Sequence, residues 1–471
     1  MRIIIPLLIF LAACARMDKR DSNATVVKGF GIESKRCEAL KDRKEFVWGE
    51  WPEDKWWEMF QDPALSNLIE SALSENFSLH SVAARVRQAQ AESDIVRSKL
   101  LPQLDAIFNV MWAYLGKELL KAFPNLTSNF QFYTGVLTFN YEFDFWGKNQ
   151  KLFAAALGEV AVQNALYQQA KISLSISIAA QYYQLQATAA KMRILLELLD
   201  NRKKQLELIA LRDKYQIDSS IDVNKIKAEV LCLQESLAAL KELLEIEKSS
   251  ILTLMGKNPT DPLDIPICLH HIHFPFELPK EIGMDLLARR ADLSAEMARV
   301  KKSANLVGVA ITEFYPNISL GGFGGFLSPD WKGFLSSKGV SAGMLPMLQL
   351  PIFHGGKIRA NLREKMATYE MHVEEYNNLL LNAANEVVSG ITTLVGVNEQ
   401  IGYHTEQAAL LRQNYELTDI KFREGISSLL VALQSKEKWL WSEMQEVDLE
   451  RIKYESVILL VKALGGGFGS E

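Results

Sequence analysis

The sequence predicts an α+β membrane protein: a long antiparallel α-helical barrel continuous with four β-strands per chain, built on an internal two-fold repeat. Residues 73–105 and 287–319 align at a fixed offset of 214 positions. Each copy runs into an alternating strand, a turn that contains Gly-Lys, and a helical tract of unusual length. Repetition of this kind predicts one pseudo-symmetric architecture, although length alone would suggest about three domains.

Four segments have the pattern of strands. In residues 131–145, apolar and aromatic side chains alternate with polar ones, with Val136 as the exception. This period of two predicts a strand with one apolar and one polar face. The other expected strands are residues 103–114, 317–326 and 343–353. Four amphipathic strands cannot close a barrel, which needs about eight, so several chains must contribute strands to one lipid-embedded barrel.

The remaining tracts are helical. Residues 148–214 contain no proline, and at 1.5 Å per residue they would span roughly 100 Å. Residues 358–423 are similar, although three glycines are expected to interrupt them, and return helices are expected at 221–255 and 427–464. Helices of this length pack on one another as a coiled coil or helical barrel. A first helix is expected from Pro63, capped by Asp62, to about residue 101, and Trp56 and Trp57 upstream are expected to pack on the body.

Composition excludes several classes of protein. The formal net charge is -5 and no basic stripe is present, so nucleic acid is not an expected partner. Aromatic residues make up 9% of the chain, which argues against global disorder. Outside the N-terminal segment the cysteines are widely spaced and odd in number, so no disulfide framework is expected: Cys37, Cys232 and Cys268.

The N-terminus has the pattern of a targeting segment. Arg2 precedes a short apolar run that ends in Leu-Ala-Ala-Cys14, which is similar to the lipobox of bacterial lipoproteins. Cys14 is therefore expected to carry covalent lipid; the alternative is a plain secretory signal with an incidental cysteine. The expected organisation is a signal peptide at 1–13, a lipid anchor and linker at 14–62, a first repeat at 63–257, an inter-repeat linker at 258–284, a second repeat at 285–465, and a tail at 466–471.

Six motifs in order then resemble one family. They lie at residues 56–65, 141–148, 287–293, 314–320, 350–356 and 462–467. Through them the chain resembles the TolC-type outer membrane factors, closest to the lipoprotein channels of tripartite RND multidrug efflux systems. The resemblance implies a homotrimer with a twelve-stranded outer-membrane barrel, a periplasmic helical tunnel, and docking to a periplasmic adaptor driven by an inner-membrane pump of the RND or another type.

The function that the resemblance implies is a passive exit duct for drugs or other small solutes, lipid-anchored in the bacterial outer membrane. Two alternatives remain: the outer-membrane duct of a type I protein secretion system, and a lipid-anchored periplasmic coiled-coil scaffold. Enzymatic activity is not expected, because no GxSxG, HExxH or P-loop motif occurs. Glu142 and Asp144 are expected to face the lumen.

The two helix-to-helix turns are the expected periplasmic tips. They are aligned at an offset of 207, which sets Asp222 opposite Leu429; ordinary αα-hairpins are the alternative interpretation. The residues expected to contact an adaptor are Tyr215, Asp218, Phe422, Arg423 and Gly425. By resemblance, Asp222, Leu430 and Gln434 mark the gate, with Arg423 as a candidate partner of Asp222. Gln434 stands where many members carry an acidic residue.

A metal site is not expected. His270, His271 and His273 lie near Cys268, but their spacing is crowded and no regular element fixes a further ligand. No cofactor is expected beyond the covalent lipid on Cys14.

Overall fold

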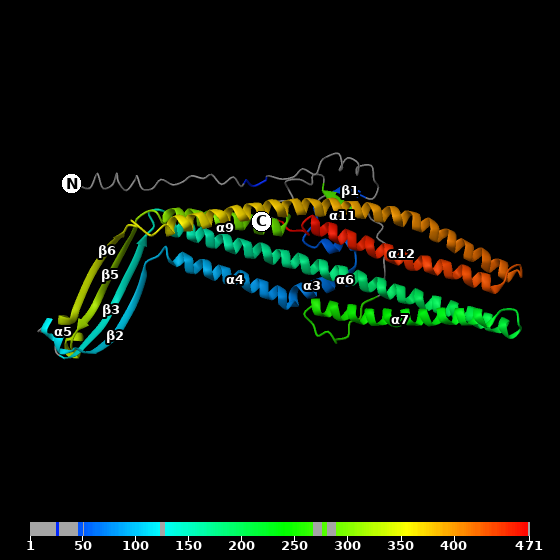
Figure 1. Cartoon of the computed structure of the whole chain (residues 1–471), viewed down its shortest axis with the longest axis horizontal. Helices are drawn as coiled ribbons and strands as arrows, with labels where there is room; N and C mark the ends of the chain where they lie inside the picture. The colour runs from blue at the N-terminus through cyan, green and yellow to red at the C-terminus, as the bar shows by residue number, and fades with distance from the viewer. Residues whose placement is uncertain are drawn as a thin grey trace. The chain divides into compact units, whose positions relative to one another are not determined.

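The computed structural model in Figure 1 describes residues 25–27, 46–49, 51–122, 128–266, 276–279 and 289–469. The chain separates into two compact units that interleave in sequence. One comprises Met1–Val26, Arg85–Asn164 and Ala295–Tyr376, and the other comprises Val27–Ala84, Ala165–Ser294 and Asn377–Glu471. The predicted signal peptide, Cys14, Cys37 and the His270–His273 cluster with Cys268 lie outside the described residues.

The element bounds repeat with matched lengths. Helices α4 (Phe77–Ser98) and α9 (Ala291–Thr312) both have 22 residues, and strands β2 (Gln103–Tyr114) and β5 (Asn317–Ser328) both have 12, at the offset of 214. The long helices repeat at an offset of 209. These are α6 (Lys148–Lys214) and α11 (Lys357–Arg423), both of 67 residues, and α7 (Ser220–Leu254) and α12 (Leu429–Ala463), both of 35.

The strands form one antiparallel sheet. With β3 (Asn129–Phe143) and β6 (Val340–Gln349), the order is β2-β3-β5-β6, which leaves β2 and β6 as its edges. The sheet confirms the four predicted strands, although β6 starts and ends earlier than expected. Asp144, expected to face a lumen from a strand, lies beyond the end of β3.

The strand register sorts the side chains by polarity. One face carries mostly apolar or aromatic side chains and glycines, with Asn129, Gln131 and Ser328 at the strand ends next to α5 and α10. Its other members are Leu104, Ala106, Phe108, Val110, Trp112, Tyr114, Tyr133, Gly135, Leu137, Phe139, Tyr141, Phe143, Ile318, Leu320, Gly322, Gly324, Phe326, Val340, Ala342, Met344, Pro346 and Leu348. The opposite face holds most of the polar residues among further apolar ones: Gln103, Asp105, Asn109, Thr134, Thr138, Asn140, Glu142, Asn317, Ser319, Ser341 and Gln349. We call the first set the apolar face. The predicted alternation in β3 therefore extends, through the pairing, across all four strands.

Short helices lie in the connections between the strands: α5 (Lys117–Ala122), α10 (Trp331–Phe334) and η2 (Ser337–Gly339). Phe334 of α10 is buried on the apolar face, with its ring 5.8 Å from that of Phe108 and 6.0 Å from that of Phe326. A Cβ atom at Gly135 would lie 2.7 Å from the Phe334 ring, so glycine is needed there to admit it.

The first predicted helix is in fact two helices, α3 (Pro63–Glu75) and α4, separated at Asn76. Asp62 caps α3 as expected, because its Oδ1 accepts from the Ala64 N–H at 2.9 Å. Asn76 has an extended backbone, and its side chain donates to the Leu254 carbonyl and accepts from the Leu79 N–H. This asparagine ends one helix and caps the next, a role that its sequence neighbourhood did not reveal.

The aromatic segment η1 (Trp56–Phe60) is part of the core of its unit, as predicted for Trp56 and Trp57. Both tryptophans are almost fully buried, and the Trp56 indole N–H donates to Ser175 Oγ at 3.1 Å. Phe60 packs edge-on against Tyr183. The structure adds a parallel pair of short strands, β1 (Phe46–Gly49) and β4 (Phe276–Pro279), within the two predicted linkers.

Helix α11 is continuous through the glycines that were expected to interrupt it. A Cβ at Gly390 would lie 3.2 Å from Leu460, so this glycine sits at a close helix contact. By length and composition alone, α11 is apolar enough to cross a membrane, which is weak support for such a span. Val387, Ile391 and Leu394 follow one helix face and are buried in the core instead.

Candidate gate and docking tips

The first tip is a turn that closes α6 by backbone geometry. The Ile217 N–H donates to the Arg212 carbonyl at 2.9 Å, and the Gln216 N–H donates to the Asp213 carbonyl at 2.8 Å. These are the two hydrogen bonds of a Schellman motif, which places Gln216 at the left-handed position with φ 57°. Glycine is the usual residue there, so Gln216 stores local strain at the tip.

Asp218 and Asp222 have separate structural partners in this tip. Asp218 is half-buried and forms a two-bond ion pair with Arg212, at 2.9 and 3.0 Å. Asp222 Oδ2 accepts from the Ser219 hydroxyl at 2.8 Å and from its N–H at 3.2 Å, which completes a capping box at the start of α7. These hydrogen bonds lower the pKa of Asp222, whose side chain is exposed.

The second tip repeats the same turn. The Ile426 N–H donates to the Lys421 carbonyl at 2.8 Å, the Gly425 N–H donates to the Phe422 carbonyl at 3.0 Å, and Gly425 has φ 71°. Ser428 precedes α12 as Ser219 precedes α7. Gly425 was predicted from its place in the turn, and its positive φ supplies the physical reason for glycine.

The offset of 207 used to align the tips is wrong by two residues. Both Schellman turns and both serines correspond at 209, so Asp222 is equivalent to Val431, not Leu429. The same shift makes Tyr215 equivalent to Glu424. The asymmetry between the tips remains: an acidic cap in the first stands where the second has an exposed valine.

The other predicted tip residues differ in exposure. Tyr215 and Phe422 are exposed, Leu430 is half-buried in the first turn of α12, and Gln434 is exposed one turn further along. Arg423 pairs with Asp419 at 2.6 Å rather than with Asp222, so the suggested Asp222–Arg423 contact is not formed within the described part of one chain. Exposed Ile217 and Ile426, at equivalent positions after the turns, were not singled out.

A polar network, also missed, lies along the tip helices. Arg202 of α6 contacts Glu229 of α7 at 3.0 Å and forms a close ion pair with Glu437 of α12. Gln205 donates to the same Glu437 carboxylate at 3.0 Å, and Asn201 donates to the Leu433 carbonyl at 2.9 Å. The network therefore joins a helix of the first repeat to one of the second. Its signal in the sequence is three polar residues, 201, 202 and 205, on an otherwise apolar helix face.

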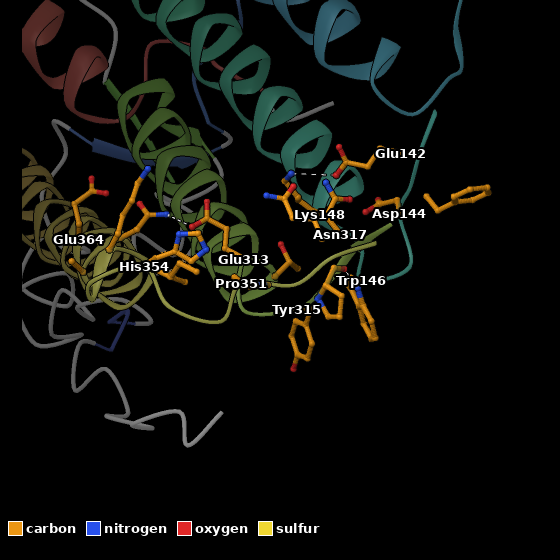
Figure 2. A pocket seen from close by; sticks show the side chains of 18 residues that line it. Glu142, Asp144, Trp146, Lys148, Glu313, Tyr315, Asn317, Pro351, His354 and Glu364 are labelled. Atoms are coloured by element: carbon orange, nitrogen blue, oxygen red, sulfur yellow. Dashed lines mark hydrogen bonds and ion pairs between the residues drawn. The ribbon is translucent and has the colours of Figure 1, made fainter. Parts of the chain in front are cut away.

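The other unit contains a pocket of about 720 Å³ where strands meet helices (Figure 2). Asp144 caps α6 there, accepting from the Asn149 and Gln150 N–H groups at 3.1 and 2.8 Å. Glu142 pairs with Lys148 at 3.2 Å. Both carboxylates expected to face a lumen are thus engaged in local structure.

Residues 68–257 and 283–466, most of the chain, match a family described as "Outer membrane efflux protein". The chain belongs to this family. It is an outer-membrane efflux protein, and the TolC-type resemblance seen in the sequence is confirmed. Similar proteins include the multidrug resistance outer membrane protein MdtP of Escherichia coli O6:H1, 26% identical over 89% of this chain and 87% of its own.

Solved structures of outer-membrane proteins are similar to this chain as well. VceC of Vibrio cholerae is 27% identical, covers 89% of this chain and 100% of its own, and superposes with a TM-score of 0.78. The outer-membrane channel OprN is 25% identical, covers 90% of this chain and 95% of its own, and has a TM-score of 0.80. OprN is described as an outer-membrane channel and VceC as an outer membrane protein, and each likeness covers about nine tenths of this chain.

Proposed function

We propose that this protein is the exit duct of a tripartite efflux pump, passively conducting drugs or other small solutes from a periplasmic adaptor and an inner-membrane pump to the outside. The observation that carries the proposal is the apolar face. A sheet with one mostly apolar face that bears no charged side chain, and an opposite face that bears carboxylates, suits lipid on one side and water on the other.

The free sheet edges support a homotrimer. Strands β2 and β6 each leave a row of backbone groups without a partner strand in the four-stranded sheet. In lipid those groups must be paired, and four strands are too few to close on themselves. Three chains would supply a twelve-stranded barrel, with β2 of one chain beside β6 of the next.

The tips are the proposed site of gating and docking. The adaptor-contact residues are Tyr215, Asp218, Phe422, Arg423 and Gly425, and the gate comprises Asp222, Leu430 and Gln434. Support comes from two exposed, geometrically matched turns that carry different side chains at the position of Asp222. The covalent lipid on Cys14 remains an expectation from sequence, checked by mass spectrometry of the mature N-terminus.

Conductance of purified protein in a planar bilayer tests the channel. Discrete steps are expected from the trimer. A protein that stays monomeric and soluble without detergent, and gives no steps, would be a periplasmic scaffold instead. Copurification after crosslinking in cells then separates drug efflux, which should yield an adaptor with an RND-type or other pump, from type I secretion, which should yield a protein cargo and its transporter.

The gate assignment has its own test. Asp222→Ala should change single-channel conductance and drug efflux, whereas Glu235→Ala, which removes an exposed acid further along α7, should change neither. If the two variants behave alike, Asp222 is a helix cap and no gate residue.

A further inference from the structure

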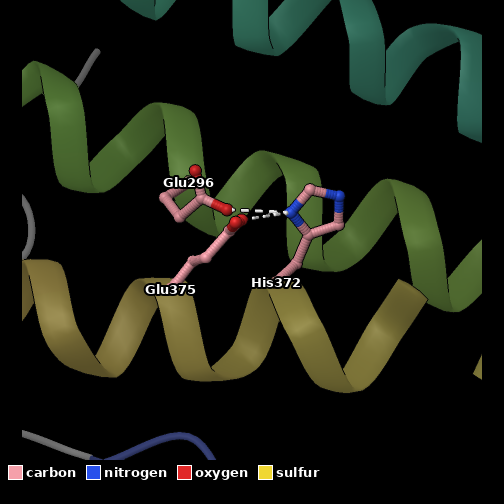
Figure 3. A group of neighbouring side chains, drawn as sticks. All are labelled: Glu296, His372 and Glu375. Atoms are coloured by element: carbon pink, nitrogen blue, oxygen red, sulfur yellow. Dashed lines mark hydrogen bonds and ion pairs between the residues drawn. The ribbon is translucent and has the colours of Figure 1, made fainter. Parts of the chain in front are cut away.

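Three side chains outside the tips converge on one point. Glu296 of α9 and His372 and Glu375 of α11, all in the unit that contains the sheet, direct their polar ends toward one another (Figure 3). His372 Nδ1 lies 3.0 Å from Glu296 Oε1 and 3.0 Å from Glu375 Oε2. One ring N–H cannot donate fully to both carboxylates, so the cluster holds more acceptor capacity than protons.

We propose that this cluster binds a divalent transition-metal cation of the zinc class. The three ligand atoms all lie within 4.8 Å of one another. A triangle with two 3.0 Å sides and a third of at most 4.8 Å has a point within about 2.5 Å of every corner. That value approaches the 2.0–2.2 Å distances of zinc to imidazole nitrogen and carboxylate oxygen, so a small inward movement completes the site.

The helix geometry also favours a metal site. His372 and Glu375 are three residues apart, which places both on one face of α11, and Glu296 comes from the adjacent helix α9. Helical bundles hold metals with related ligand sets, in which an acid and a histidine three residues apart on one helix join an acid from a facing helix. In this chain the histidine precedes the acid.

Burial and a neighbouring arginine hold the proposed ligands in position. The side chain of Glu296 is only 7% exposed, and its second oxygen accepts from Arg299 Nη1 at 2.6 Å. Arg299 therefore holds the carboxylate in one orientation through Oε2 and leaves Oε1 for the metal. His372 is 20% exposed and Glu375 is 54% exposed, so an ion can enter from the Glu375 side. The imidazole ligand favours zinc-class metals over magnesium or calcium.

The test measures zinc bound to the full-length protein, purified in detergent with any affinity tag removed, after equilibrium dialysis against micromolar zinc. His372→Ala should lose one zinc per chain relative to the wild type. Glu375→Gln should weaken zinc binding by tenfold or more. His354→Ala removes another histidine of the same unit, from outside the cluster, and should leave the stoichiometry unchanged. Any zinc bound by the remaining histidines is the same in the wild type and the three variants, so it does not affect the differences between them.

Circular dichroism checks that each variant is folded, and cobalt(II) provides an independent readout. Cobalt bound by one nitrogen and two oxygens should give a visible absorption band in the wild type that Glu375→Gln alters and His372→Ala abolishes. Equal zinc stoichiometry in the wild type and His372→Ala, or an unchanged cobalt spectrum, overturns the proposal and leaves the cluster as an ion-pair network. Neither result bears on export, because the proposed channel does not depend on the metal.

Discussion

Removing Arg202 should loosen α12 locally. Arg202 is 17% exposed and Glu437 is 15% exposed, so their ion pair is largely buried, whereas Glu229 is 37% exposed. Breaking a buried pair by removing one partner costs about 3–5 kcal/mol. Solvent screens the Glu229 contact, so we expect the lower end, about 3 kcal/mol, for Arg202→Met. The methionine retains the apolar stem and removes the guanidinium.

Amide hydrogen exchange of the purified protein measures this loss. Where amide exchange follows local opening of the helix, a loss of about 3 kcal/mol in the free energy of opening makes exchange faster by roughly 100-fold. The effect should be confined to α12 near residues 433–440 and to the facing turn of α6. The matched control is Lys204→Met, which removes an exposed ion pair with Asp200 on the same helix and should change exchange little.

A second variant separates charge from packing. Adding Glu437→Met to Arg202→Met removes the buried unpaired carboxylate and should recover much of the protection, because apolar replacements of buried pairs are often neutral. The reasoning is refuted if Arg202→Met exchanges like Lys204→Met, or if exchange rises equally throughout the helices.

Three further predictions concern the sheet, the core and the tip. Leu137→Arg on the apolar face should cost about 2–4 kcal/mol in lipid and lower the yield of assembled protein in outer-membrane fractions. The adjacent Thr138→Arg, on the opposite face, should be tolerated. Equal yields of the two variants would contradict the face assignment. Burial raises the pKa of the Glu247 carboxyl above its ordinary value of 4.5. Folding stability should therefore fall as the pH rises from about 4.5 through the raised pKa. Glu247→Gln should abolish this pH dependence in thermal unfolding. Gln216→Gly, at φ 57°, should slow amide exchange at the first tip, and faster exchange there would exclude strain at this turn.

Most of the fold was predictable because it depends on local patterns. Proline-free tracts and period-two alternation located the long helices and the four strands within a few residues. The break at Asn76 was not predictable, because the asparagine is held by the carbonyl of Leu254, which is distant in sequence. The short β1–β4 pair was missed for the same reason, since four-residue strands in polar linkers have no pattern of their own.

The candidate site was only partly predictable. Gly425 was predicted from its place in the helix-to-helix turn. The equivalent left-handed position in the first tip is Gln216, which has no glycine to mark it, and the tips were aligned two residues out of register. The Arg202 network and the cluster at His372 each join residues far apart in the chain. A single sequence shows which residues on the long helices are polar, but not which of them are in contact in the fold.

The matched helix lengths restrict where the two halves can diverge. One residue inserted into α6 would rotate everything beyond it by about 100° and advance it by 1.5 Å, which would turn its apolar face away from its neighbours. From α4 and α9 onward, the described halves differ in length by five residues only between the first strand and the long helix, at 115–147 against 329–356, while the paired helices keep equal lengths. Insertions, epitope tags and loop exchanges should therefore be accepted in the parts of those segments that lie outside strands β3 and β6. A change in helix length should be accepted only in whole heptads made in both repeats at once.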